Sequence, residues 1–190
     1  LGVIIITTIL IFSIRKIRAI HKLQHEHERK MCATLSDAIR STHSLDYPLH
    51  LVKGSDFVKR SKLCVHESMH DEDKLLVIDT VNSVDKFIAQ GNPIIFFSHQ
   101  WTSLDEPDYT GEQFAAMIKS LKEITRDRGW DTTLEKVYVW VDYCCVPQGN
   151  ASTQALAVRS LAPYVSCASA FIVVAPTCKH KSVPINCDIK

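Results

Sequence analysis

The chain has 190 residues, of which 46% are hydrophobic and 23% are charged, and its 22 Lys and Arg residues nearly balance its 21 Asp and Glu residues. This composition excludes a disordered chain and is typical of a globular domain that can bury a sizeable core. The net charge of +1 provides no overall positive field, so nucleic acid is not an expected partner.

The first fourteen residues, LGVIIITTILIFSI, carry no charge and are mostly β-branched or large apolar side chains. Arg15, Lys16 and Arg18 follow them directly. We expect residues 1–14 to be a truncated transmembrane helix, because a helix needs about 20 apolar residues to span a bilayer. The bilayer is therefore an expected partner, and the basic flank predicts a single-pass membrane protein whose following domain is cytoplasmic. A signal-peptide core and a buried strand are the alternatives.

Residues 15–74 are expected to form a juxtamembrane helix and a linker region. Apolar side chains recur at a loose helical spacing among charged ones up to about residue 40. Such a helix can lie against anionic lipid or be a solvated linker, and both interpretations stay open. Residues 41–74 show the least defined pattern.

The seven cysteines are odd in number and include no C-x-x-C pair. This pattern argues against a zinc ribbon and against a disulfide framework. Free thiols agree with a reducing, cytoplasmic location.

A possible metal motif lies within the linker region. His66, Glu67 and His70 match H-E-x-x-H, which on a helix places two imidazoles on one face for zinc and the glutamate beside the bound water. Acidic residues 71–73 follow where a zinc-enzyme helix would stay apolar, and no third ligand has a recognisable spacing. A zinc hydrolase is therefore a remote alternative.

From residue 75 onward, short apolar runs alternate with helical patterns. Strands are expected at residues 75–78, 94–97, 137–141 and 171–174, and helices at 81–90, 111–128 and 153–164. Continuously apolar strands are buried on both faces, and helices between them act as crossovers. Residues 75–190 therefore predict an α/β domain with a parallel sheet flanked by helices.

Polar and aromatic side chains follow two of these strands. Ligands bind outside the carboxyl ends of parallel strands, so these residues predict the rim of a pocket for a ring-bearing, hydroxyl-rich ligand. The candidate ligand-binding residues are Ser98, His99, Trp101, Asp142, Tyr143, Cys145 and Gln148.

Each candidate also has a purely structural interpretation. Asp142 can cap a helix or turn, Trp101 can pack under a loop, and His99 can bond to backbone. Cys144 or Cys145 beside His99 can form a thiol and base pair, although a buried apolar cysteine is the more common situation.

A triad of Ser98, His99 and Asp142 is disfavoured because consecutive strand residues point apart. The six glycines are scattered, so the chain has no glycine-rich phosphate loop.

The segments IIFFSHQW, VWVDYCCVPQ and AFIVVAP, in this order, resemble the Toll/interleukin-1 receptor (TIR)-like and heterokaryon-incompatibility (HET) superfamily. The resemblance covers about residues 90–176. Its two motifs are S-x-x-W and W-x-D-x-x-C-x-x-Q, matched by Ser98, Trp101, Trp140, Asp142, Cys145 and Gln148.

The resemblance implies a flavodoxin-like sheet and a membrane-anchored, cytoplasmic signalling or response domain that binds a nucleotide or associates with copies of itself. Some TIR relatives cleave NAD with a glutamate near a Trp-Cys pair, and residues 177–190 contain no Trp-Cys-x-x-Glu. The catalytic residues are thus unknown, and no cofactor is certain. The alternative is an NAD glycohydrolase whose acid lies beyond the C-terminus of an incomplete domain, with NAD as the substrate.

Overall fold

The computed structural model describes residues 22, 24, 26, 29–30 and 44–181. The chain divides into two units, Leu1–Ser41 and Thr42–Lys190, and the fold below is that of the second. The expected transmembrane segment, residues 1–14, lies outside the described residues. Within the described part of the chain, no helix combines the length and apolarity needed to cross a membrane.

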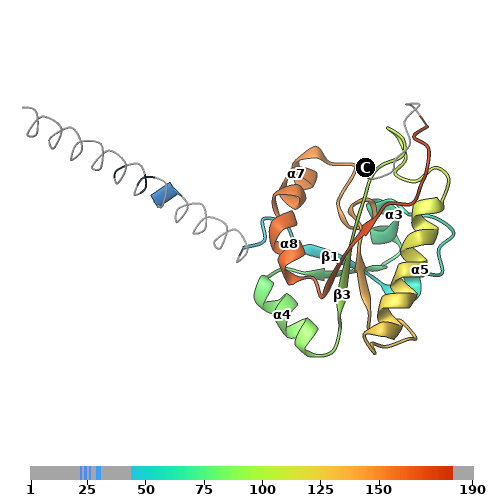
Figure 1. Cartoon of the computed structure of the whole chain (residues 1–190), viewed down its shortest axis with the longest axis horizontal. Helices are drawn as coiled ribbons and strands as arrows, with labels where there is room; N and C mark the ends of the chain where they lie inside the picture. Colours follow the sequence, from blue (N-terminus) through green and yellow to red (C-terminus); the bar gives the residue numbers. More distant parts are fainter. Residues whose placement is uncertain (1–21, 23, 25, 27–28, 31–43, 182–190) are drawn as a thin grey trace, which may run out of the picture. The chain divides into compact units, whose positions relative to one another are not determined.

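The second unit contains a five-stranded sheet with helices on its two faces (Figure 1), which confirms the α/β class. The strands lie in the order β2-β1-β4-β3-β5. Their bounds are β1 Leu49–Lys53, β2 Leu75–Ile78, β3 Ile94–His99, β4 Tyr138–Trp140 and β5 Ala170–Val174.

The sheet is mixed, which corrects the expectation of a wholly parallel one. β3 pairs in parallel with β4 and with β5, whereas β1 is antiparallel to both β2 and β4. The expectation rested on helical crossovers between successive strands, and these do join β2 to β3, β3 to β4 and β4 to β5. β2, however, pairs with β1, which precedes it in the chain and runs in the opposite direction.

The sheet also begins earlier in the chain than residue 75. β1 lies between β2 and β4, and its first four residues are buried. Two short helices, α2 Gly54–Phe57 and α3 His66–Asp71, follow it. Residues 49–71 therefore contribute to the α/β unit instead of forming a linker.

The three helices expected after residue 75 are present, with one of them divided. The first two are α4 Val81–Ala89 and α5 Glu112–Asp127. The segment expected as one helix forms α7 Ala151–Arg159 and α8 Leu161–Cys167. Pro163 accounts for the division, because proline has no N–H for the Arg159 carbonyl and its ring clashes with that carbonyl in a continuous helix.

Aromatic packing fixes the sheet on both faces. On one face, Phe96 stacks on Trp140 with ring centroids 4.0 Å apart, and Trp140 in turn contacts Tyr164 of α8. On the other face, Phe57 packs against Phe97 of β3 and, edge to face, against Phe114 of α5. The register that pairs Phe96 with Trp140 brings the carboxyl ends of β3 and β4 together.

Candidate functional site

The candidate site centres on Asp142, the first residue of the short helix α6 Asp142–Cys145, directly after β4. Its Oδ1 accepts hydrogen bonds from His99 Nε2 at 2.9 Å and from the Tyr143 backbone N–H at 2.7 Å. Its Oδ2 accepts a hydrogen bond from Trp101 Nε1 at 2.9 Å. The structure therefore joins the two polar strand ends through one carboxylate.

The hydrogen bonds keep Asp142 ionised. Burial raises the pKa of its carboxyl group, but the hydrogen bonds from His99, Trp101 and the Tyr143 amide, together with the charge of His99, outweigh burial and hold the pKa below its usual value. Because an ionised carboxylate only accepts hydrogen bonds, Nε2 of the His99 ring carries a proton. The His99 side chain is 1% exposed, whereas that of Asp142 is 39% exposed.

Two aromatic side chains border the carboxylate. The rings of Trp101 and Tyr143 meet edge to face, with centroids 5.7 Å apart and planes at 88°. Both residues are half-buried, so part of each ring is accessible to a ligand.

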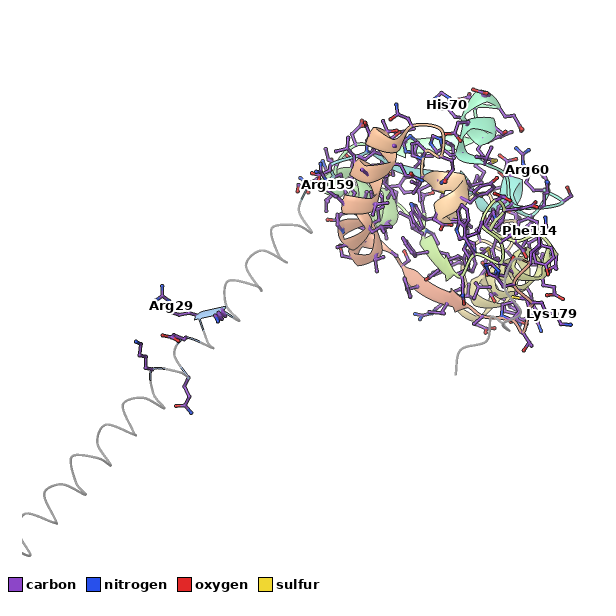
Figure 2. The ribbon with its side chains drawn as sticks, turned by 90° about the horizontal axis from the view of Figure 1, so that it is seen from above. Arg29, Arg60, His70, Phe114, Arg159 and Lys179 are labelled. Carbon is purple, nitrogen blue, oxygen red and sulfur yellow. The ribbon has the colours of Figure 1, made fainter. Side chains whose placement is uncertain are left out.

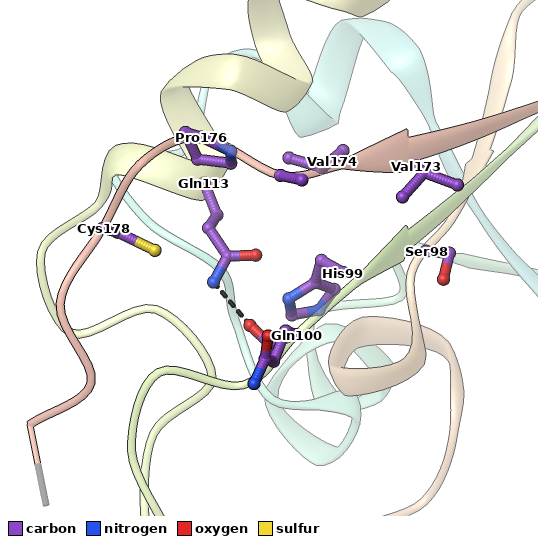
Figure 3. Close-up of a pocket in the computed structure, with 9 residues that line it drawn as sticks. Ser98, His99, Gln100, Gln113, Val173, Val174, Pro176 and Cys178 are labelled. Atoms are coloured by element: carbon purple, nitrogen blue, oxygen red, sulfur yellow. Dashed lines mark hydrogen bonds between the residues drawn. The ribbon is translucent and has the colours of Figure 1, made fainter. Parts of the chain in front are cut away.

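Two cavities open beside this cluster, and Ser98 and His99 contribute to both. One, of about 250 Å³, lies on the α8 side of the sheet and is otherwise lined by Phe96, Phe97, Trp140, Asp142, Leu161 and Val165. The other, of about 230 Å³, lies toward α5 and the end of β5 (Figure 3) and is otherwise lined by Gln100, Gln113, Val173, Val174, Ala175, Pro176 and Cys178.

Cys145 does not reach either cavity. Its buried Sγ donates to the Val139 carbonyl at 3.8 Å, and burial raises its pKa to about 12. Burial likewise raises the pKa of the Cys144 thiol well above its usual value. The structure therefore places both thiols in the core rather than beside a base.

Gln148 has a structural position. Its side-chain Nε2 donates to the Val146 carbonyl at 2.8 Å, while its backbone N–H donates to Glu67 Oε1 at 2.8 Å. The Gly149 N–H donates to the same oxygen at 2.7 Å. Glu67 thus fixes the loop that follows α6 from 81 positions earlier in the chain.

The H-E-x-x-H residues are not arranged as a zinc site. Glu67 is engaged with the loop after α6, and His70 lies at the surface of α3 with a side chain that is 67% exposed (Figure 2). The buried His66 ring packs against the His50 ring, with centroids 5.1 Å apart. Over the residues that the structure describes, no group of three His, Cys, Asp or Glu side chains is placed to hold a metal ion.

Gln113 is a site residue that the sequence did not indicate. It lies in the first turn of α5, is 1% exposed, and donates from Nε2 to the Gln100 carbonyl at 2.5 Å. The sequence feature that could have identified Gln113 is its place beside Phe114 and Met117, where a polar side chain lies on the apolar face of a helix. The contact of Glu67 with the loop after α6 had no comparable signal, because its partners are distant in sequence.

Comparison of the chain with models of protein families, with curated proteins and with solved structures found no match.

Proposed function

We propose that the second unit is a TIR/HET-like response domain that binds a nucleotide where the carboxyl ends of β3 and β4 meet. The observation that carries the proposal is the Asp142 carboxylate, ionised and held by three donors beside two cavities. A carboxylate offers about four acceptor positions, and protein donors occupy three of them. The remaining position, on a side chain that is 39% exposed, suits a ligand hydroxyl such as that of a ribose.

The surroundings of Asp142 favour a ligand with a ring. Trp101 and Tyr143 present partly exposed aromatic surfaces on one side of the carboxylate. Each adjoining cavity, of about 230 or 250 Å³, has the size of part of a nucleotide rather than all of it. The TIR/HET-like assignment rests on the two motifs, since the antiparallel strand β1, between β2 and β4, departs from a flavodoxin-like sheet.

Calorimetric titration of the full 190-residue chain with purine and pyrimidine nucleotides and NAD tests the proposal. We expect Asp142→Asn to weaken binding at least about tenfold, as the loss of a hydrogen bond to a charged group implies. Asp127→Asn is the matched control, because that carboxylate is 69% exposed at the far end of α5. Binding that is absent in the wild type, or equal in all three proteins, contradicts the proposal.

The same titrations separate binding from catalysis. Incubation with NAD, followed by measurement of released nicotinamide, detects cleavage directly. Binding of NAD without release supports a binding module, whereas release supports the NAD-cleaving alternative.

We further propose that the domain associates with copies of itself through β5. This strand forms one edge of the described sheet, and Phe171 and Val173 on it are 50% and 55% exposed. An edge strand with exposed apolar side chains offers both free backbone groups and an apolar surface to a second copy.

The proposal includes a membrane anchor formed by residues 1–14 and a cytoplasmic location for the α/β unit. The uncharged apolar sequence of residues 1–14 and the basic residues that follow this segment support both the anchor and the location. Replacing Ile5 and Ile9 with Asp is expected to release the chain from membranes during alkaline extraction. Retention of that variant contradicts an anchor at these residues.

A further inference from the structure

β5 forms one edge of the described sheet (Figure 1), and the hydrogen bonds of its neighbour β3 show which way its backbone groups point. The Pro93 carbonyl accepts the Tyr138 N–H, so the backbone groups of residues 93, 95 and 97 face β4. The Ile94 carbonyl accepts the N–H of Ser169, in the bend before β5. Residues 94, 96 and 98 therefore face β5.

Phe171 and Val173 are the residues of β5 whose backbone groups point away from the sheet. β3 and β5 are parallel, with Phe96 opposite Phe171, and opposite residues of parallel strands direct their backbone groups the same way. Because the backbone groups of Phe96 point toward β5, those of Phe171 point away from β3. The same holds for Val173, two positions further along, while the other three residues of β5 pair with β3.

The same two residues carry the exposed apolar side chains of β5. Phe171 is 50% exposed and Val173 is 55% exposed. Both side chains lie on one face of the strand, where the Phe171 ring stacks on the Phe96 ring with centroids 5.3 Å apart. The edge thus offers backbone donors, backbone acceptors and an apolar surface at the same two positions, and these are the features that an added β-strand uses.

The distribution of charge favours a second copy of this chain as the added strand. Residues 167–176, CASAFIVVAP, include no charged side chain. Natural edge strands are commonly protected from pairing by charges, and the other edge of the described sheet has Lys74 directly before β2 and Asp79 directly after it. A second β5 brings no like charge to this edge, so an identical strand pairs with it without repulsion.

We infer that β5 pairs antiparallel with β5 of a second copy about a two-fold axis, with Ile172 opposite Ile172 of that copy. This inference rests on the proposed self-association through β5 and specifies its direction and register. A closed two-fold dimer places the same surface of both copies in contact. In this register Phe171 lies opposite Val173 of the second copy, so their outward backbone groups form hydrogen-bonded pairs and an aromatic ring meets a β-branched side chain.

The register also sets the strength of the contact. It pairs all five residues of β5 in each copy. Five residues from each side bury far less than the roughly 1,600 Å² of a standard interface, so we expect a weak dimer whose population rises with protein concentration.

Cross-linking of introduced cysteines tests the register. The experiment uses full chains in which four native cysteines are replaced with Ser, leaving the three buried ones: Cys32, Cys64, Cys167 and Cys187 are the positions replaced. The two opposed Ile172 residues form a non-hydrogen-bonded pair with Cα atoms about 4.5 Å apart, which is within disulfide range. Ile172→Cys should therefore be trapped mostly as a dimer when diamide oxidises the two thiols to a disulfide. Val77→Cys, on the other edge strand, is the matched control and should remain a monomer.

Two further variants distinguish this register from its neighbours. Phe171→Cys and Val173→Cys should cross-link with each other when the two proteins are mixed. Neither should cross-link with itself, because the two identical positions lie two residues out of register and beyond disulfide reach.

Hydrogen exchange of the unmodified chain covers the case in which a cysteine variant fails to fold. The backbone N–H groups of Phe171 and Val173 should exchange with deuterium more slowly as the protein concentration rises, because pairing between copies engages them. The Ile172 N–H pairs with β3 in the monomer and should change much less.

The outcomes separate the inference from the self-association on which it rests. A wild-type mass that stays monomeric in light scattering at all concentrations overturns both. A mass that rises without cross-linking of Ile172→Cys, or with cross-linking of Phe171→Cys to itself, overturns the register and leaves the association standing. Exchange of the Phe171 and Val173 N–H groups that is equally slow at every concentration would show that something other than a second copy covers the edge, and would overturn the inference.

Discussion

His99 Nε2 donates a hydrogen bond to Asp142 Oδ1 at 2.9 Å across 43 positions of sequence. The pair unites two strand ends and places a proton on Nε2 of the imidazole. Asp142 lines one of the two adjoining cavities, and His99 contributes to both. The two cavities beside this hydrogen bond therefore differ, because a carboxylate lines only one of them.

Replacing Asp142 with Asn is expected to lower stability most at neutral pH. The folded-state pKa of Asp142 lies below its usual value of 3.8, so its stabilising contribution is complete above that value and is lost as pH falls through the lower folded pKa. We expect Asp142→Asn to lower the free energy of unfolding by about 1–2 kcal/mol at pH 7, reduced by partial solvent exposure.

Urea denaturation at pH 7 and near pH 3 measures this effect. The difference between wild type and variant should shrink at the lower pH, while Asp127→Asn should match the wild type at both. A difference that does not depend on pH would assign the effect to packing rather than to the charge of Asp142.

The buried histidines predict a second pH dependence. Burial, followed by the charge of His66, lowers the pKa of His50 to about 4, against an ordinary value of 6.5. The unfolded chain therefore binds a proton that the folded chain does not between these values, and stability falls as pH drops from about 6.5 to 4. The His50 contribution is at most on the order of 3 kcal/mol.

His50→Phe should flatten this part of the stability curve in urea denaturation, because phenylalanine keeps a ring beside Tyr47 and His66 but does not titrate. His70→Gln, at an exposed position, should leave most of the slope in place. An unchanged slope in the His50 variant would mean that another group titrates over this range.

Much of the architecture follows from local sequence pattern. Some elements can be predicted from their own residues alone. The periodic apolar residues of α4 and α5 predict helices, the continuous apolar run of β3 predicts a buried strand, and the structure confirms all three. β1 was missed because its sequence, LHLVK, is short and partly polar, and its burial comes from two neighbouring strands. The expectation of a wholly parallel sheet was wrong because β1 lies antiparallel between β2 and β4, and local pattern does not contain such pairing across the chain.

The candidate site was also predictable from the sequence only in part. Residues directly after β3 and β4 were identifiable because the ends of adjacent parallel strands converge. Gln113 was not identified, and Glu67 was identified only as part of a metal motif, because their roles depend on partners reached only after folding: Gln100 across the loop before α5, and the amides of Gln148 and Gly149.

The contacts of Glu67 predict that its role is structural and does not depend on a metal ion. Its Oε1 accepts the backbone N–H groups of Gln148 and Gly149, so Glu67→Ala leaves two donors without this acceptor. We expect a loss of about 1–3 kcal/mol in unfolding free energy, and a smaller loss for Glu67→Gln, which retains an acceptor oxygen. Zinc content measured by mass spectrometry should be the same for both variants and the wild type. Stoichiometric zinc that is lost with Glu67→Ala or His66→Ala would favour the hydrolase alternative instead.

The exposed side chains of β5 predict how self-association can be interrupted. Val173 is 55% exposed on this edge strand, so Val173→Lys places a charge in the proposed contact without disturbing a buried residue. Charged side chains on an edge oppose pairing with a second copy, because the pairing would desolvate them. Light scattering over a range of concentrations should therefore show a smaller average mass for Val173→Lys than for the wild type. Val77→Lys is the matched control, since Val77 is 46% exposed on β2 at the opposite edge and should leave the mass unchanged. Equal masses for the wild type and Val173→Lys, or an equal decrease with Val77→Lys, would remove β5 as the contact between copies.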